Sequence, residues 1–191
     1  DTAEFTAWHL DPDRRPQGGR TIRVEDHEPN DKFVNELLSA RPDGALKLSP
    51  AATPPEAWRA SAEWEWISRG GECRQLVVWF GSLAEQVRTT SATRIANDGG
   101  HETLRGTPRT SLQQAPRMGR YIVEPDPAVL AAGLIGSFAE RHQLLGLEPG
   151  IGYLTGDVAP GDFLSASFEV LAVMPFQTKR LKALLRSRGV G

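Results

Sequence analysis

Near the start of the chain stands the sequence Phe5-Thr6-Ala7-Trp8-His9-Leu10-Asp11-Pro12-Asp13-Arg14-Arg15. Its apolar part is typical of a β-strand, and the Asp-Pro pair would end that strand because proline has no N–H to give to a sheet. In open α/β sheets, ligands bind just outside the carboxyl ends of the strands, so Asp11 would lie within reach of a ligand. We therefore predict a strand followed by a candidate catalytic loop containing Asp11 and Pro12. An ordinary strand-to-loop turn with solvated arginines behind it is the alternative.

A basic loop follows this stretch. It contains Gly18 and Gly19, and Arg14, Arg15 and Arg20 flank the two glycines. Glycine allows close approach of the backbone, and guanidinium groups match the geometry of phosphate. These five residues are therefore candidates for contact with a phosphate-bearing substrate. A solvated surface loop would have the same composition.

The next segments predict a helix, a strand and a hairpin. Asn30 is a typical N-cap, and an apolar stripe at helical spacing runs from there until Pro42. A short strand over 45–49 follows. The alternating residues 63–67 and the apolar run 75–80 then predict a β-hairpin whose tryptophans belong to the core or, alternatively, stack on bases. The first part of the chain is thus predicted as the second half of an α/β sheet that ends in an antiparallel pair.

A stretch without apolar periodicity divides the chain. Residues 97–119 are rich in Gly, Pro, Thr, Arg and Gln, and we predict a linker or long loop there. This places one domain over 1–96 and a second over 120–191. The second is predicted to be α+β, with strands over 121–123, 151–154 and 167–173 and helices capped by Asp126 and Thr178.

The last of these helices is basic and amphipathic. Lys179, Arg180 and Lys182 surround an apolar side, and Gly189 stands where a C-terminal cap would lie. The three cations are candidates for binding a phosphate backbone. They would equally form the solvated face of an ordinary amphipathic helix.

The composition limits the possible classes. At 191 residues the chain can form one ordinary domain or two small ones, and a net charge of −2 does not indicate a general nucleic-acid binder. A single cysteine excludes an internal disulfide and fits a reducing compartment. The four histidines are too scattered for a metal site, and no apolar run is long enough to span a membrane. We therefore expect a cytoplasmic protein without metal or membrane partners, and the start at Asp1 predicts a portion of a longer protein.

Three groups of residues resemble bacterial class I S-adenosylmethionine (SAM)-dependent methyltransferases that carry a C-terminal THUMP-like domain. They are Leu10–Arg15 with Gly18-Gly19-Arg20, the hairpin Glu63–Gly81, and a C-terminal module that includes Glu124-Pro125-Asp126, Tyr153–Asp157 and Lys179-Arg180-Leu181. The resemblance implies that residues 1–96 are the C-terminal half of a Rossmann-like methyltransferase sheet. It also implies that residues 120–191 form a small α+β THUMP-like domain.

By this resemblance, Asp11-Pro12 is the acidic motif after the fourth strand of the sheet, beside the methyl group of SAM. Asp11 would accept a hydrogen bond from the attacking atom, and Pro12 would fix the loop. The glycine-rich SAM-binding turn of the family and its ribose-binding acidic residue have no counterpart here. SAM is therefore the expected cofactor of a longer parent, the fragment alone is expected to be inactive, and no cofactor-binding residue is assigned.

Two departures from the family pattern affect the substrate. Asp13 stands where a small residue is expected, and no aromatic residue directly follows Asp11-Pro12, which weakens the case for a base amine. RNA is expected as the partner by analogy with true THUMP domains. The alternatives are a non-catalytic RNA-binding or interaction module and a methyltransferase of a protein or small molecule. An incomplete sheet would expose an edge strand, through which self-association is expected.

Overall fold

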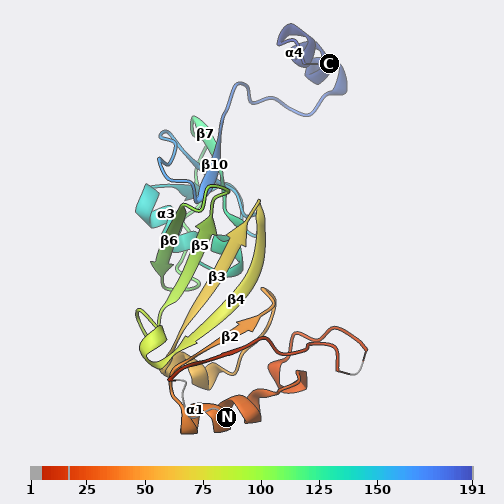
Figure 1. Ribbon diagram of the computed structural model, residues 1–191. Helices are drawn as coiled ribbons and strands as arrows, with labels where there is room; N and C mark the ends of the chain where they lie inside the picture. The colour runs from red at the N-terminus through yellow and green to blue at the C-terminus, as the bar shows by residue number, and fades with distance from the viewer. Residues whose placement is uncertain (1–5, 17, 191) are drawn as a thin grey trace.

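The computed structural model describes residues 6–16 and 18–190, which form two β-sheets and flanking helices (Figure 1). The first sheet contains β1 (Trp8–Leu10), β2 (Gly44–Leu48), β3 (Ala62–Arg69), β4 (Glu72–Phe80), β5 (Thr90–Ile95) and β6 (His101–Gly106). The second contains β7 (Tyr121–Pro125), β8 (Leu145–Gly146), β9 (Leu154–Gly156) and β10 (Ser165–Glu169). The α-helices are α1 (Asp31–Ala40), α2 (Pro127–Ala131), α3 (Ile135–His142) and α4 (Thr178–Ser187). Short 3₁₀ helices are η1 (Val24–Asp26), η2 (Glu56–Ala60) and η3 (Gly81–Leu83).

The first sheet has the strand order β1-β2-β4-β3-β5-β6. Strands β1 and β2 are parallel, whereas β4 lies antiparallel between β2 and β3. The predicted strand, helix, strand and hairpin are therefore confirmed. Helix α1 begins as expected, because the Asn30 side chain accepts hydrogen bonds from the backbone N–H groups of Lys32 and Phe33 at 3.1 and 3.2 Å.

The loop predicted over 97–119 is wrong in part, because strand β6 occupies 101–106. It pairs antiparallel with β5, which in turn lies parallel to β3. The two strands show no apolar periodicity in the sequence, because buried positions of β5 are polar and their polar groups are satisfied by hydrogen bonds. Ser91, for example, is fully buried and donates its hydroxyl to Glu63 Oε1 on β3 at 2.9 Å. The placement of a domain boundary in this region stays a prediction.

The second sheet has the order β10-β7-β9-β8. Asp126 caps α2 as predicted, and its carboxylate accepts the backbone N–H of Ala128 at 2.8 Å. The strand expected at 151–154 is shifted to β9, and the strand expected at 167–173 ends at Glu169. Thr178 is the first residue of α4 rather than its cap, because Gln177 holds the capping position.

A continuous apolar core connects the two sheets. Its fully buried members include Leu46 and Phe80 of the first sheet and Val123 and Phe138 of the second part. Helix α2 packs against β3, β4 and β5. Trp64 and Trp66 are 4 % and 6 % exposed, which confirms that the tryptophans of β3 belong to the core.

Helix α4 lies apart from both sheets at the end of an extended segment (Figure 1). Gly189 ends it as predicted, with a left-handed φ of 71° and a hydrogen bond from the Val190 N–H to the Leu185 carbonyl at 3.0 Å. No helix in the described ranges is both long enough and apolar enough to cross a bilayer.

Cys73 on β4 gives a test of the packing between α2 and the sheet. Burial, with a smaller effect of the Asp126 carboxylate, raises the pKa of this thiol to about 11. Because the thiolate is the nucleophile, alkylation by iodoacetamide should be slow at neutral pH and rise roughly tenfold per unit between pH 7 and 9. Mass spectrometry of the chain beside a model cysteine peptide measures the rate. A rate equal to that of the peptide would contradict the buried environment.

Candidate active site

The carboxyl ends of β1 and β2 lie side by side and bring Asp11 next to Lys47. The two strands are parallel, and Leu10 lies opposite Leu46. The residues that follow them, Asp11 and Lys47, therefore lie at the same edge of the sheet. Asp11 Oδ2 accepts a charge-assisted hydrogen bond from Lys47 Nζ. The side chains of Asp11 and Lys47 are 55 % and 39 % exposed, so the pair is accessible to a ligand.

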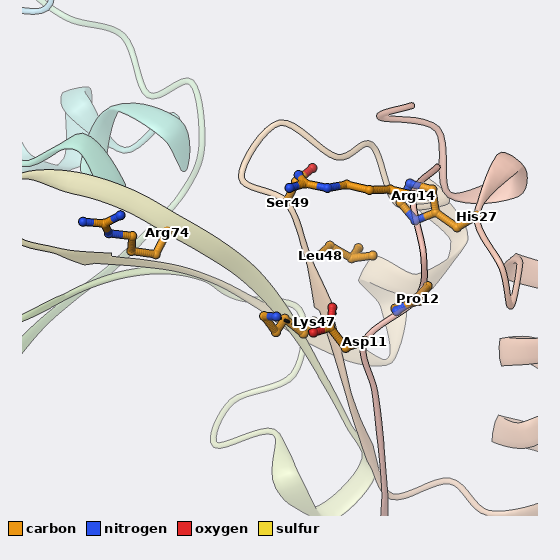
Figure 2. A pocket seen from close by; sticks show the side chains of 8 residues that line it. All are labelled: Asp11, Pro12, Arg14, His27, Lys47, Leu48, Ser49 and Arg74. Carbon is orange, nitrogen blue, oxygen red and sulfur yellow. Dashed lines mark hydrogen bonds and ion pairs between the residues drawn. The ribbon is translucent and has the colours of Figure 1, made fainter. Parts of the chain in front are cut away.

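This ion pair lies at one end of a small pocket, which we call the Asp11 pocket (Figure 2). It is lined by Asp11, Pro12, Arg14, His27, Lys47, Leu48, Ser49 and Arg74. Its volume is about 110 Å³, whereas small-molecule sites typically have roughly 300–1,000 Å³. The Asp11 pocket therefore fits a single reacting group or a phosphate, and it does not fit SAM as a whole.

The two ends of the loop that follows Asp11 lie next to each other. Asp13 and Glu28 exchange two backbone hydrogen bonds, of 2.8 and 2.9 Å, which hold the ends of the intervening loop together. The Asp13 carboxylate accepts the backbone N–H of Arg15 at 2.9 Å. This bond gives Asp13 a local role in the turn that carries Arg14.

His27 enters the Asp11 pocket from the far end of this loop. It is 3 % exposed, and its Nε2 lies 3.2 Å from the Thr21 carbonyl oxygen. The neighbouring carbonyl accepts only from a protonated nitrogen, so the neutral ring carries its hydrogen on Nε2. Its Nδ1 has no hydrogen-bond partner among the described residues. His27 thus offers a buried, unused acceptor in the wall of the pocket.

The structure brings together only some of the residues proposed from the sequence. Arg14 lines the pocket with Asp11 and Pro12, whereas Gly19 and Arg20 line a separate hollow. Arg15 and Gly18 are exposed outside both. The three cations Lys179, Arg180 and Lys182 lie on α4, away from the sheets (Figure 1).

Sequence reasoning missed His27, Lys47, Ser49 and Arg74. Lys47 carries a usable signal, because it is the single charged residue of the otherwise apolar strand β2. His27 carries none, since only closure of the loop brings it to Asp11. No group of three or more His, Cys, Asp or Glu side chains that could hold a metal ion occurs in the described part of the chain.

The chain shows clear similarity to named proteins, although no family model matches it. Two proteins of Mycobacterium tuberculosis, from strains CDC 1551 / Oshkosh and ATCC 25618 / H37Rv, are each 31% identical to it over 184 residues. Both are named "Uncharacterized S-adenosylmethionine-dependent methyltransferase". The homologues of this chain are SAM-dependent methyltransferases. The alignment covers 95% of this chain and 49% of each relative, so the chain spans about half the length of these proteins.

A solved structure has the same fold. It is a crystal structure from Porphyromonas gingivalis W83, described as that of a "putative methyltransferase", with a TM-score of 0.76 and 24% identity. The match covers 95% of this chain and 47% of that one. At this identity the similarity shows the fold alone, and it supports the mixed α/β architecture with its six-stranded sheet.

Gly44 positions the strand that carries Asp11, and this predicts the effect of a substitution. A Cβ at Gly44 would come within 2.1 Å of the Trp8 ring, which is held by a 2.9 Å hydrogen bond from Nε1 to the Arg41 carbonyl. We expect Gly44→Ala to displace Trp8 and lower the free energy of unfolding by about 1–3 kcal/mol. Urea denaturation measures this change. Gly161→Ala is the matched control, because a Cβ there meets nothing within 4 Å. Equal stability of the two variants would contradict the prediction.

Proposed function

We propose that this chain is the acceptor-presenting part of a SAM-dependent methyltransferase. The observation that carries the proposal is the Asp11–Lys47 pair at the carboxyl edge of two parallel strands, in a chain whose homologues are named as such enzymes. That edge is where α/β sheets bind their ligands. The short β1 pairs only with β2 within the described residues, so its other edge is open to further strands.

The Asp11 pocket does not by itself fit SAM. It is too small for a nucleoside, and the glycine-rich SAM-binding turn that the family resemblance implies has no counterpart in the sequence. Since the curated relatives are about twice as long, we propose that the SAM-binding strands lie outside these 191 residues and continue the sheet beyond β1. The short chain alone would then be inactive, and self-association would use the same open edge.

The residues of the Asp11 pocket would hold and orient the acceptor. In this proposal the Asp11 carboxylate accepts a hydrogen bond from the attacking atom, and Lys47 holds the carboxylate in place. Pro12 fixes the start of the loop, and Arg14 contacts a phosphate of the substrate. His27 lines the same pocket, with its Nδ1 buried and without a partner among the described residues. Positioning of this kind is the main contribution that a protein makes to such a transfer.

We propose RNA as the substrate. Support comes from Arg14 in the pocket and from α4 and its end, where residues 178–190 contain five cations and no acidic residue. In this view the segment after residue 120 is a THUMP-like RNA-binding module in a cytoplasmic enzyme. A steep decrease of RNA affinity with salt is expected, because cations that contact phosphates release counterions.

A second candidate function is an interaction module without catalysis. The segment that leads into α4 exposes Leu171, Val173, Met174 and Phe176, and Phe176 is 85 % exposed. Contiguous exposed apolar side chains are typical of surfaces that dock another protein. This reading would leave the Asp11 pocket without a chemical role.

The test uses a version of the chain extended N-terminally to the length of the M. tuberculosis relatives. It is incubated with methyl-labelled SAM and, separately, with RNA, protein and small-molecule fractions from its own cells. Label in RNA supports the whole proposal. Label in another fraction keeps the methyltransferase and overturns the RNA substrate, whereas no label in any fraction favours the interaction module.

A further inference from the structure

A second, larger cavity lies against β3. We call it the tryptophan pocket; it lies between Trp64 and Trp66 of β3, Arg59 of η2, and the Arg109 and Gly133 backbone turns. Its volume is about 410 Å³, which falls within the roughly 300–1,000 Å³ of small-molecule sites. One wall is the segment 50–54, which directly follows Ser49 of the Asp11 pocket. The two pockets therefore share the loop after β2.

Arg59 forms a fixed cationic wall of this pocket. Its guanidinium lies 3.7 Å from the centroid of the Trp64 ring, and it donates a 3.1 Å hydrogen bond to Thr90 Oγ1. A second bond of 3.2 Å runs from its Nε to Glu56 Oε2. About a third of the side chain remains exposed (34 %). A guanidinium held in this way presents a flat surface on which an aromatic ring can stack.

Arg109 supplies a second cation at the rim. Its backbone has a left-handed φ of 61°, unusual for a residue other than glycine, and its N–H donates to the Gly133 carbonyl at 2.9 Å. Its side chain makes no hydrogen bond or ion pair with any residue in the described ranges 6–16 and 18–190. Strained backbone conformations of this kind cluster at ligand sites. The guanidinium is thus available for an anion.

Trp64 adds an independent indication of a ligand. Its indole N–H is buried and has no acceptor among the described residues. Buried polar groups in native proteins are nearly always paired, so such a donor calls for an acceptor that the described residues do not supply. The remaining walls are mainly proline, alanine and tryptophan side chains, which suit a flat apolar ring.

We propose that the tryptophan pocket binds one nucleotide of the RNA substrate. The base stacks on the exposed face of the Arg59 guanidinium, and its phosphate binds Arg109. An aromatic ring with an attached anion matches a pocket with apolar walls, a flat cation and an unpaired cation at the rim. The proposal rests on the proposed function, because it takes the nucleotide to be part of an RNA substrate of the methyltransferase.

The experiment measures binding without SAM. Adenosine and uridine 5′-monophosphate are titrated into the ¹⁵N-labelled 191-residue chain, and the indole N–H signals are followed by NMR. The Trp64 signal is assigned by its loss in Trp64→Phe. We expect this signal to shift with a dissociation constant below about 10 mM. Inorganic phosphate should bind at least about tenfold more weakly, because it lacks the ring.

Substitutions at the two arginines test the contacts. Arg109→Asn should weaken nucleotide binding about tenfold, since asparagine keeps the left-handed backbone but lacks the charge. The matched control is Arg88→Asn, because Arg88 has a φ of 64° and does not line the pocket. Arg59→Lys should also weaken binding about tenfold, because it keeps the charge and loses the flat surface.

Several results would overturn the nucleotide site. They are an unmoved Trp64 signal, equal affinity of Arg109→Asn and the unchanged chain, and phosphate binding as tight as that of the nucleotides. None of them depends on methyl transfer. If the protein methylates RNA but gives one of these results, only the nucleotide site is contradicted. If the chain binds nucleotides but the extended protein transfers no methyl group, the nucleotide site stands and the proposed methyltransferase activity is contradicted.

Discussion

Asp11→Ala is expected to lower the rate of methyl transfer by the N-terminally extended protein about 100- to 10,000-fold. The reason is that Asp11 is the carboxylate at the carboxyl edge of β1, fixed by Lys47 at the mouth of a pocket that fits a single reacting group. SAM affinity should change less than about twofold, because the Asp11 pocket does not hold the cofactor. Initial rates with labelled SAM and calorimetric SAM binding measure the two effects separately.

Glu36→Ala serves as the control for Asp11. It removes a carboxylate from the exposed side of α1, outside the Asp11 pocket, and should leave the rate unchanged. A normal rate in Asp11→Ala would contradict the assignment. A rate lost together with SAM binding would show that Asp11 supports the cofactor rather than the acceptor.

Phe80→Ala is expected to lower the free energy of unfolding by about 3–5 kcal/mol. Phe80 is 1 % exposed, and its ring centroid lies 5.7 Å from that of Trp8 and 5.6 Å from that of Trp58. Removal of the ring leaves a cavity between β4, β1 and η2 that these large neighbours cannot fill. Urea denaturation followed by circular dichroism gives the change.

Phe33→Ala is the control for Phe80. Phe33 is 46 % exposed on α1, and surface substitutions of this kind usually change stability by less than about 0.5 kcal/mol. A loss below about 1 kcal/mol in Phe80→Ala would mean that the aromatic cluster is not a central part of the core.

Apolar periodicity made much of the fold predictable. The strand before Asp11, helix α1 with its Asn30 cap and the β3–β4 hairpin follow from local patterns. Strands β5 and β6 do not, because their buried positions include Ser91 and Thr93, which are satisfied by partners on other strands. A buried polar residue cannot be recognised from the hydropathy pattern when its hydrogen-bond partner is distant in the sequence.

The candidate site could be predicted only in part for a related reason. Asp11 and Pro12 mark the end of a strand, which is a local signal. His27 reaches the same pocket only because Asp13 and Glu28 close the loop between them. Helix α4 was predictable from the helical spacing of its apolar residues. Its position away from the sheets was not, because an amphipathic pattern does not show what covers the apolar side of a helix.

Calorimetric titration of SAM tests the central claim most directly. It would use the 191-residue chain and a version extended N-terminally to the length of the M. tuberculosis relatives. We expect binding to the extended version and none to the short chain, because the described residues hold no pocket for SAM beside Asp11. Binding to the short chain would place the cofactor site within these residues. Binding to neither would contradict the assignment of this chain to a methyltransferase.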